Sequence, residues 1–271
     1  MTDKTFSSAV HKSRFELLYK HYNSRKWVHP DPLEFLYDYP DLRDREIIGL
    51  IASSLAYGRV SQILKSVAVI LDEIGPSPAE YLQSASSAHI RSRFNKFKHR
   101  FTTGREIALF LQGIKLVIKK FGSLQDCFLS SYKDKDESIL PALCFFVKEL
   151  RKPYKDHPCS LLPLPEKGSA CKRLHLFMRW MVRKDMIDPG GWNNIATSRL
   201  IIPLDTHMYR IGNLLDFSSR KSADIRTALE ITRAFGEIVP EDPVKYDFAL
   251  TRLGIRDDAS INQLIDTKDT N

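Results

Sequence analysis

The feature that most constrains the fold is a series of apolar segments that repeat with helical spacing. Residues 44–57 form the most strongly apolar of them, and Gly58 follows where a helix of this length would end. Residues 60–74 repeat the pattern, and two more such segments cover residues 103–118 and 138–150. Because no run alternates between apolar and polar residues as strands do, the sequence predicts an all-α protein.

A proline-rich segment, residues 151–168, interrupts this helical pattern. It holds four prolines, and proline breaks helices because it lacks a backbone N–H and fixes φ. We therefore expect the 271-residue chain to be one unit of two helical lobes joined by an extended connector. The expected parts are an N-terminal lobe 1–150, the connector 151–168, a C-terminal lobe 169–256 and a polar tail 257–271.

The overall charge favours a polyanionic partner. Lys and Arg number 41 against 33 Asp and Glu, which gives a net charge of +8 and a pI near 9.2. The alternative is a surface charge that only keeps the protein in solution. The hydrophobic content of 43% is enough to bury a core, so the chain should be globular and not disordered.

The sequence predicts a cytoplasmic protein with no metal, no cofactor and no membrane contact. The four cysteines (Cys127, Cys144, Cys159 and Cys171) form no C-x-x-C pair and have no zinc or iron–sulfur spacing. We therefore expect free thiols in a reducing compartment. The most apolar stretches are too short to cross a bilayer, and no signal-peptide pattern opens the chain.

The helix predicted after the connector carries a row of basic residues on one face. Lys172, His175, Arg179 and Arg183 fall within roughly 80° of one another on a helical wheel, opposite an apolar face. Such a row, with Trp180 at its edge, suits a surface that follows a phosphate backbone. The alternative is an ordinary solvated helix face.

Lys172 differs from the other residues of this row in its position. Ser169 is a candidate N-cap, which places Lys172 in the first helical turn. The positive end of the helix dipole disfavours a cation there and favours the neutral amine that Schiff-base chemistry requires. The alternative is a lysine that points to solvent or grips a phosphate.

Asp205 stands between an apolar extended segment, residues 200–204, and a predicted helix. Pro203 discourages helix before it, and aspartate is among the best N-cap residues. Helix capping is therefore one interpretation of Asp205. Catalysis is the other, and the two are compatible because a capping carboxylate is held rigidly.

The segment Pro203-Leu-Asp205-Thr-His207-Met-Tyr-Arg210 resembles the V-D-T-H-x-x-R segment of helix-hairpin-helix DNA glycosylases. This resemblance implies a two-lobed helical fold with a cleft between the lobes, and it makes Asp205 the essential acid. The wider chain is similar to a bacterial family of uncharacterised proteins. The segments that carry this second similarity are Ala56-Tyr57-Gly58, Lys172 to Phe177, Pro203 to His207 and Asp242 to Leu250.

The position of the lysine follows one branch of that superfamily. Most members that use a lysine place it just after an L-P-G-V-G hairpin, but no lysine lies between the hairpin candidate Asp188–Trp192 and Asp205. Lys172 lies 33 residues before Asp205 (205 − 172), which is similar to archaeal 8-oxoguanine DNA glycosylases. The resemblance therefore implies Lys172 as nucleophile and Asp205 as acid.

Several further residues are candidates for nucleic-acid contact. Arg59 and Gln62 lie at a predicted corner between two helices, where Gln62 could read a base edge. Arg100 belongs to a basic and aromatic segment, residues 91–101, that suits a backbone contact. The alternatives for these residues are capping, surface solvation and core packing. The remaining candidates are His175, Arg179, Arg183, His207 and Arg210.

These observations predict a base-excision repair enzyme, a DNA glycosylase with AP-lyase activity. It would bind damaged double-stranded DNA as a monomer and excise a flipped base, for example an oxidised purine, without a metal. One alternative is a non-catalytic nucleic-acid-binding protein that retains the glycosylase scaffold. Another is an interaction protein with no nucleic-acid role.

Overall fold

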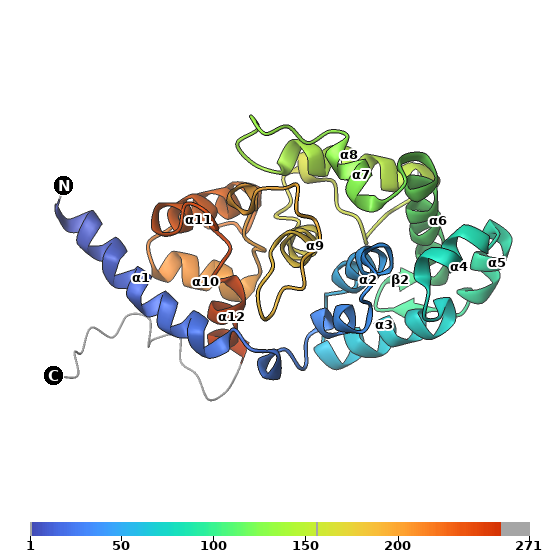
Figure 1. The fold of residues 1–271 in the computed structure, drawn as a ribbon, viewed down its shortest axis with the longest axis horizontal. Coiled ribbons are helices and arrows are strands. Elements are labelled where there is room, and N and C mark those ends of the chain that lie inside the picture. Colours follow the sequence, from blue (N-terminus) through green and yellow to red (C-terminus); the bar gives the residue numbers. More distant parts are fainter. Residues whose placement is uncertain (1, 156, 256–271) are drawn as a thin grey trace.

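The computed structural model describes residues 2–155 and 157–255, and this part of the chain is mostly helical (Figure 1). The prediction of an all-α protein is confirmed here, apart from one hairpin of two-residue strands. No helix within the described residues is long and apolar enough to cross a membrane. The predicted polar tail, residues 257–271, lies outside the described residues.

The secondary structure follows the expected segments closely in the first half of the chain. The first eight helices are α1 (Thr2–Tyr22), α2 (Leu42–Ser54), α3 (Val60–Ile74), α4 (Pro78–Ser84), α5 (Ser87–Arg93), α6 (Gly104–Phe121), α7 (Leu124–Leu129) and α8 (Leu140–Arg151). Strands β1 (Lys98–His99) and β2 (Thr102–Thr103) pair antiparallel between α5 and α6. Short 3-10 turns occupy η1 (Arg25–Trp27) and η2 (Pro32–Asp38).

The second half has fewer and more widely spaced helices. They are α9 (Lys172–Val182), α10 (Thr206–Leu214), α11 (Ile225–Ile238) and α12 (Asp247–Ile255). The proline-rich connector is largely extended, with 3-10 turns η3 (Lys152–Tyr154) and η4 (Pro165–Lys167). A further turn, η5 (Thr197–Arg199), precedes the extended segment that leads to Asp205.

The helices form two groups with α9 between them (Figure 1). Helices α2 to α8 make one group, while α1 packs with α11 and α12 in the other. The expected N-terminal lobe 1–150 is therefore wrong for α1, which joins the C-terminal helices. The physical reason is its aromatic face, where Phe15 packs against Phe235 and Tyr246.

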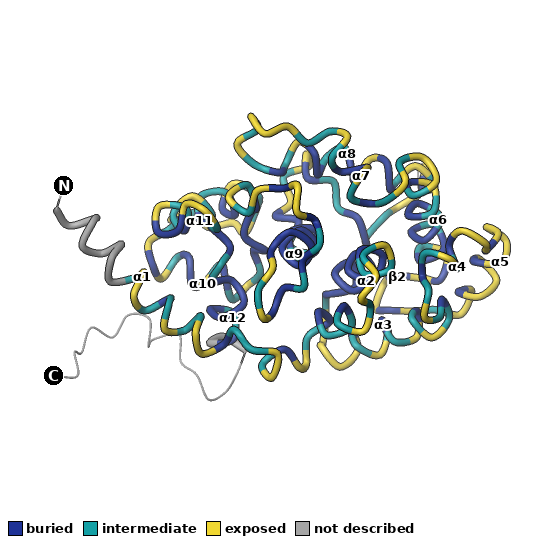
Figure 2. Tube along the Cα trace, viewed as in Figure 1, coloured by how far each residue is buried: buried dark blue, intermediate teal, exposed yellow. Residues whose placement is uncertain are grey.

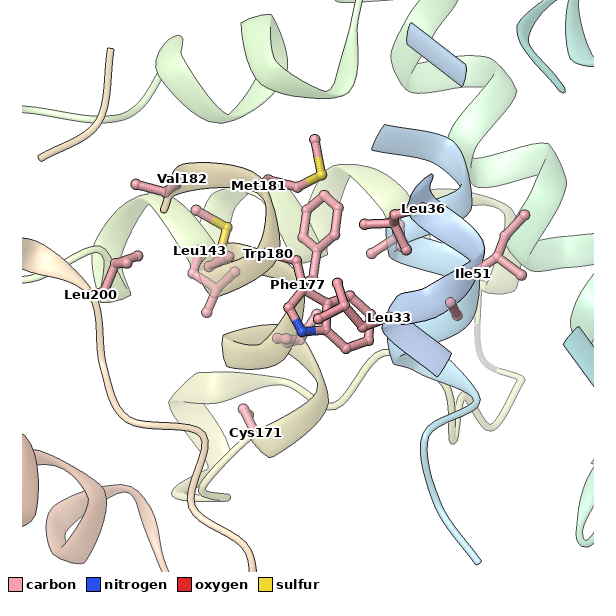
Figure 3. Packing of buried hydrophobic residues seen from close by; sticks show 14 of the residues in the cluster. Leu33, Leu36, Ile51, Leu143, Cys171, Phe177, Trp180, Met181, Val182 and Leu200 are labelled. Carbon is pink, nitrogen blue, oxygen red and sulfur yellow. The ribbon is translucent and has the colours of Figure 1, made fainter. Parts of the chain in front are cut away.

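Helix α9 ties the two groups together because it packs tightly against α2. Figure 2 shows α9 as one of the most deeply buried elements, and Figure 3 shows Phe177 and Met181 beside Leu36. Gly49 of α2 makes this approach possible, since a Cβ there would lie 3.3 Å from both Leu36 Cδ2 and Met181 Sδ. The small residue in α2 thus permits the close packing of α9 against it.

Two acidic side chains near the starts of helices contact distant segments of the chain. Thr103 makes no capping hydrogen bond to α6, and Glu106 instead accepts from Ser160 N and Oγ in the connector. Helix α12 begins at Asp247. Asp242, which precedes it, accepts a hydrogen bond from Arg183 Nε at 2.8 Å. Both side chains therefore form tertiary hydrogen bonds.

The expected solvent-facing basic row on α9 is wrong for three of its four members. His175, Arg179 and Arg183 are buried, because the loop after α9 and the start of α12 cover this face. Arg179 pairs with Asp188 and Asp247, while Arg183 pairs with three acids. Those acids are Asp185, Asp188 and Asp242.

The buried position of these residues rules out a contact with phosphate in this conformation. Burial lowers the pKa of His175 to about 3, so the ring is neutral, and neither ring nitrogen has a hydrogen-bond partner within the described residues. The two guanidinium groups neutralise buried carboxylates and not an external backbone. Lys172, at 35% side-chain exposure, is the partly exposed member of the row, and both Lys172 and the buried Arg179 line a cavity.

The buried position of Arg183 has a measurable consequence for stability. Arg183→Met leaves Asp185, Asp188 and Asp242 without this cation, so the free energy of unfolding should fall by about 3–5 kcal/mol. Denaturant unfolding measures the change. Lys184, the exposed residue next to Arg183, offers a matched control. Lys184→Met should change the free energy of unfolding by about 0.5 kcal/mol or less. Equal effects of the two substitutions would contradict the buried ion pairs.

Candidate active site

A cavity of about 790 Å³ lies where the two groups of helices meet. Its walls come from residues 30–32, the segment between α2 and α3, the start of α3, the connector, α9, the segment before α10, residues 223–224, and α12. Most of the wall is apolar or backbone, and a small number of charged side chains converge on it. The charged side chains that line the cavity are Asp31, Lys172, Arg173, Arg179, Asp205, Asp224, Asp247 and Arg252.

Lys172 and Asp205, predicted as a pair from separate segments, face each other in this cavity. The distance from Lys172 Nζ to Asp205 Oδ2 is 3.7 Å. This is an ion-pair distance that is longer than a hydrogen bond. Both side chains are partly shielded, with exposed fractions of 35% and 18%. A carboxylate and an amine this close can exchange a proton after a small movement.

Asp205 uses its two carboxylate oxygens for two separate purposes. Oδ1 caps α10 by accepting from His207 N at 2.9 Å and from Met208 N at 2.8 Å. Oδ2 is the oxygen that faces Lys172. The expected helix cap is therefore confirmed, and it fixes the carboxylate while leaving one oxygen for chemistry.

The first turn of α9 is held by its neighbours and not by the expected cap. Cys171, with φ of +46°, occupies the N-cap position, and Ser169 Oγ accepts from Cys171 N at 3.3 Å. Arg173 then donates to Ser54 O and Ser160 O at 2.6 and 2.5 Å. These bonds fix the backbone on both sides of Lys172, so the amine is presented from a rigid turn.

The mouth of the cavity carries an aromatic stack. The rings of Tyr57 and Phe101 lie 5.0 Å apart at 20°, and the Arg173 guanidinium lies 4.9 Å from the Tyr57 ring centroid. Phe101 is 62% exposed at the tip of the β1–β2 hairpin. Arg100 precedes it with φ of +51°, and its side chain covers Gly58 at the cavity edge.

The other predicted contact residues fall into two sets. His207 lines the cavity, while Arg59, Gln62, Arg100 and Arg210 are exposed and lie outside its described lining. The structure therefore places one of them beside Lys172 and Asp205 and leaves four on the surface. Arg59 and Gln62 belong to the start of α3, whose Val60 and Ile63 line the cavity.

The hairpin candidate, residues 188–192, uses its backbone N–H groups internally. Gly190 N donates to Trp180 O and Trp192 N donates to Met181 O, at 3.0 and 2.8 Å. Asp188 N donates to Asp185 Oδ1 at 2.8 Å. Because helix-terminal or hairpin amides bind phosphate only when they are unpaired, these three amides cannot anchor a phosphate in this conformation.

Sequence reasoning missed five charged residues of the cavity, which are Asp31, Arg173, Asp224, Asp247 and Arg252. Asp247 is 2% exposed, and burial, reinforced by the nearby charge of Asp205, raises its pKa to about 6. One signal was available, because an acidic residue inside the apolar segment 244–250 needs a buried partner of opposite charge. That partner, Arg179, is 68 residues away (247 − 179) and could not be read from spacing.

The fold and the cavity define a helical protein with a lysine–aspartate pair enclosed between two groups of helices. Residues 31–256 match the family described as "Protein of unknown function (DUF2400)", and the chain belongs to this family. No curated protein matches the chain, and no solved structure matches it. No group of three or more His, Cys, Asp or Glu side chains in the described residues is arranged to hold a metal ion.

The two uses of Asp205 can be separated by substitution. Asp205→Ala removes the cap of α10 and should lower the free energy of unfolding by about 1 kcal/mol, whereas Asp205→Asn keeps a capping oxygen and should cost less. Both remove the negative charge that faces Lys172. Thermal or denaturant unfolding checks the prediction, and equal losses in the two variants would contradict the capping role.

Proposed function

We propose that this protein is a DNA repair glycosylase with AP-lyase activity. The observation that carries the proposal is the Lys172–Asp205 pair, 3.7 Å apart in a cavity between two groups of helices. An amine next to a carboxylate in a partly enclosed site is the arrangement that Schiff-base catalysis requires. The sequence around Asp205, which resembles the glycosylase V-D-T-H-x-x-R segment, supports the same assignment.

The proposal includes the glycosylase-like arrangement of the helices. The support is the position of the cavity, since α9 and α10 contribute Lys172 and Asp205 from one side while Tyr57 and Ile63 contribute from the other. A base that leaves the duplex could enter such a cavity and be enclosed between the two groups. The net charge of +8 supports a polyanionic partner.

The proposed reaction begins with proton transfer from Lys172 Nζ to Asp205 Oδ2. The neutral amine attacks C1′ of the damaged nucleoside as the bond between C1′ and the base nitrogen breaks. The electron pair of that bond leaves with the base, which takes up a proton. That proton comes from Asp205 Oδ2, and the carboxylate restored in this way stabilises the positive charge that develops on the sugar.

The lyase step follows from the covalent adduct. The nitrogen on C1′ loses a proton and the sugar ring opens, with its oxygen taking up a proton, to give a Schiff base between Lys172 and C1′. Removal of a C2′ proton then breaks the bond between C3′ and its phosphate oxygen, which cuts the strand. Water hydrolyses the Schiff base and restores the amine of Lys172.

The exposed residues near the cavity fit a role in holding the strand. Arg59 and Arg100 lie at the edge that carries Phe101, while Gln62 is on the first turn of α3. Arg210 lies on α10 beyond Asp205. Guanidinium groups around a cavity mouth suit contacts to phosphates on both sides of an extruded nucleotide.

A second candidate is a nucleic-acid-binding protein that retains this scaffold without turnover. The observation that favours it is the hairpin at residues 188–192, whose amides are paired internally. A glycosylase needs the strand held firmly, because positioning supplies much of the rate enhancement. DNA binding that weakens steeply with salt but gives no covalent adduct would support this candidate.

Borohydride trapping tests the proposed reaction directly. Reduction of the Schiff base should give a covalent complex between the protein and a duplex that contains an abasic site. Lys172→Gln should abolish the complex, and Asp205→Asn should reduce its rate of formation by roughly a hundredfold or more, the range of one acid–base group. Gel electrophoresis of labelled duplex measures both.

The control for this experiment is an exposed lysine outside the cavity. Lys184→Gln should trap at the rate of the unmodified protein, because Lys184 is exposed just after α9. A complex that survives Lys172→Gln would remove Lys172 from the role of nucleophile. Lack of any complex with the unmodified protein would remove the proposed reaction.

A further inference from the structure

The floor of the cavity carries a second charged pair that the proposed reaction does not use. Asp247 and Arg179 both line the cavity, and Asp247 Oδ2 accepts a hydrogen bond from Arg179 Nη1. The other oxygen, Asp247 Oδ1, is buried and has no hydrogen-bond partner among residues 2–155 and 157–255. A buried oxygen without a hydrogen-bond donor costs free energy, so the position of Asp247 Oδ1 indicates that a bound molecule supplies the donor.

Arg179 also keeps hydrogen-bonding capacity in this position. Its Nη1 is bound to Asp247 and its Nε donates to Asp188 Oδ1 at 3.2 Å. These two hydrogen bonds use two of the N–H groups of the guanidinium. A guanidinium offers five N–H donors in one plane, so the pair can present a donor and an acceptor side by side.

The spacing along α9 suits a nucleobase. Arg179 follows Lys172 by seven residues on the same helix face, a rise of about 10 Å. This is close to the length of a purine from its sugar carbon to its far edge, with a hydrogen bond beyond that edge. Asp205 is near enough to Asp247 for its charge to act on that carboxyl. A sugar at Lys172 would therefore direct its base toward Asp247 and Arg179.

We propose that Asp247 and Arg179 read the Watson–Crick edge of the extruded base, with Oδ1 of Asp247 accepting a ring or amino N–H. This inference rests on the proposed function. It assigns the substrate class as damaged bases whose Watson–Crick edge keeps unsubstituted N–H donors, such as bases oxidised on the imidazole ring. Bases alkylated on that edge, and etheno adducts, place carbon where the buried acceptor needs N–H and are excluded.

The chemistry of the pair supports an acceptor at neutral pH. Burial raises the pKa of Asp247 to about 6, so the group is mainly a carboxylate at the pH of a standard repair assay. A carboxylate donates no hydrogen bond and cannot adapt to an edge that lacks N–H. Sites that hydrogen-bond a substrate reject analogues without the matching group far more strongly than apolar pockets reject a size change.

The first test uses the unmodified protein and paired substrates. One pair of duplexes carries 8-oxoguanine or 1-methyl-8-oxoguanine, and the other pair carries hypoxanthine or 1-methylhypoxanthine. A duplex with an abasic site is also included. We expect at least a hundredfold slower borohydride trapping for the methylated member of a pair. Equal trapping within the pairs, or reaction with the abasic duplex only, overturns the inference. Failure to trap the abasic duplex instead removes the proposed function.

The second test changes the acceptor itself. Asp247→Asn should lower the ratio of trapping with the base-bearing duplex to trapping with the abasic duplex by at least tenfold. Glu241→Gln is the control, because Glu241 is an exposed acid near the start of the same segment. An unchanged ratio in folded Asp247→Asn overturns the inference. If the variant does not fold, as thermal unfolding would reveal, the paired-substrate test decides the question.

Discussion

Buried ion pairs made by two arginines at the C-terminal half of α9 fix the position of this helix between the two groups of helices. Arg179 and Arg183 are both buried, and each pairs with Asp188 in the loop that follows the helix. Arg179 also reaches α12 through Asp247. Buried charges are tolerated only when partners replace the lost hydration. The position of α9 relative to its loop and to α12 is therefore fixed by the need to keep each charge paired.

The same constraint shapes the cavity. Because α9 is held on one side by these ion pairs and on the other by close packing at Gly49, its first turn has little freedom to move. Arg173 completes the arrangement by bonding to the end of α2 and to the connector. Lys172 is thus presented toward Asp205 by a rigid scaffold, which is the condition for a reaction that depends on precise approach.

The cavity holds two charged pairs at different depths. Lys172 and Asp205 lie near the first turns of α9 and α10, and they are partly exposed. Asp247 and Arg179 lie deeper and carry the unpaired acceptor. In the proposed function the first pair acts on the sugar and the second reads the base. For a family described only as of unknown function, these are separate and separable assignments.

The sequence determined most of the helices and the two segments that supply one charged pair of the cavity. Apolar spacing with a terminal glycine placed α3 correctly, and the preference of aspartate for an N-cap placed Asp205 at the start of α10. These are local properties, set by residues within a few positions of one another. Only the tertiary structure decided that Arg179 and Arg183 are buried and that Asp247 belongs to the cavity. A helical wheel shows which residues share a face but not what covers that face, and the covering acids come from segments folded back onto it.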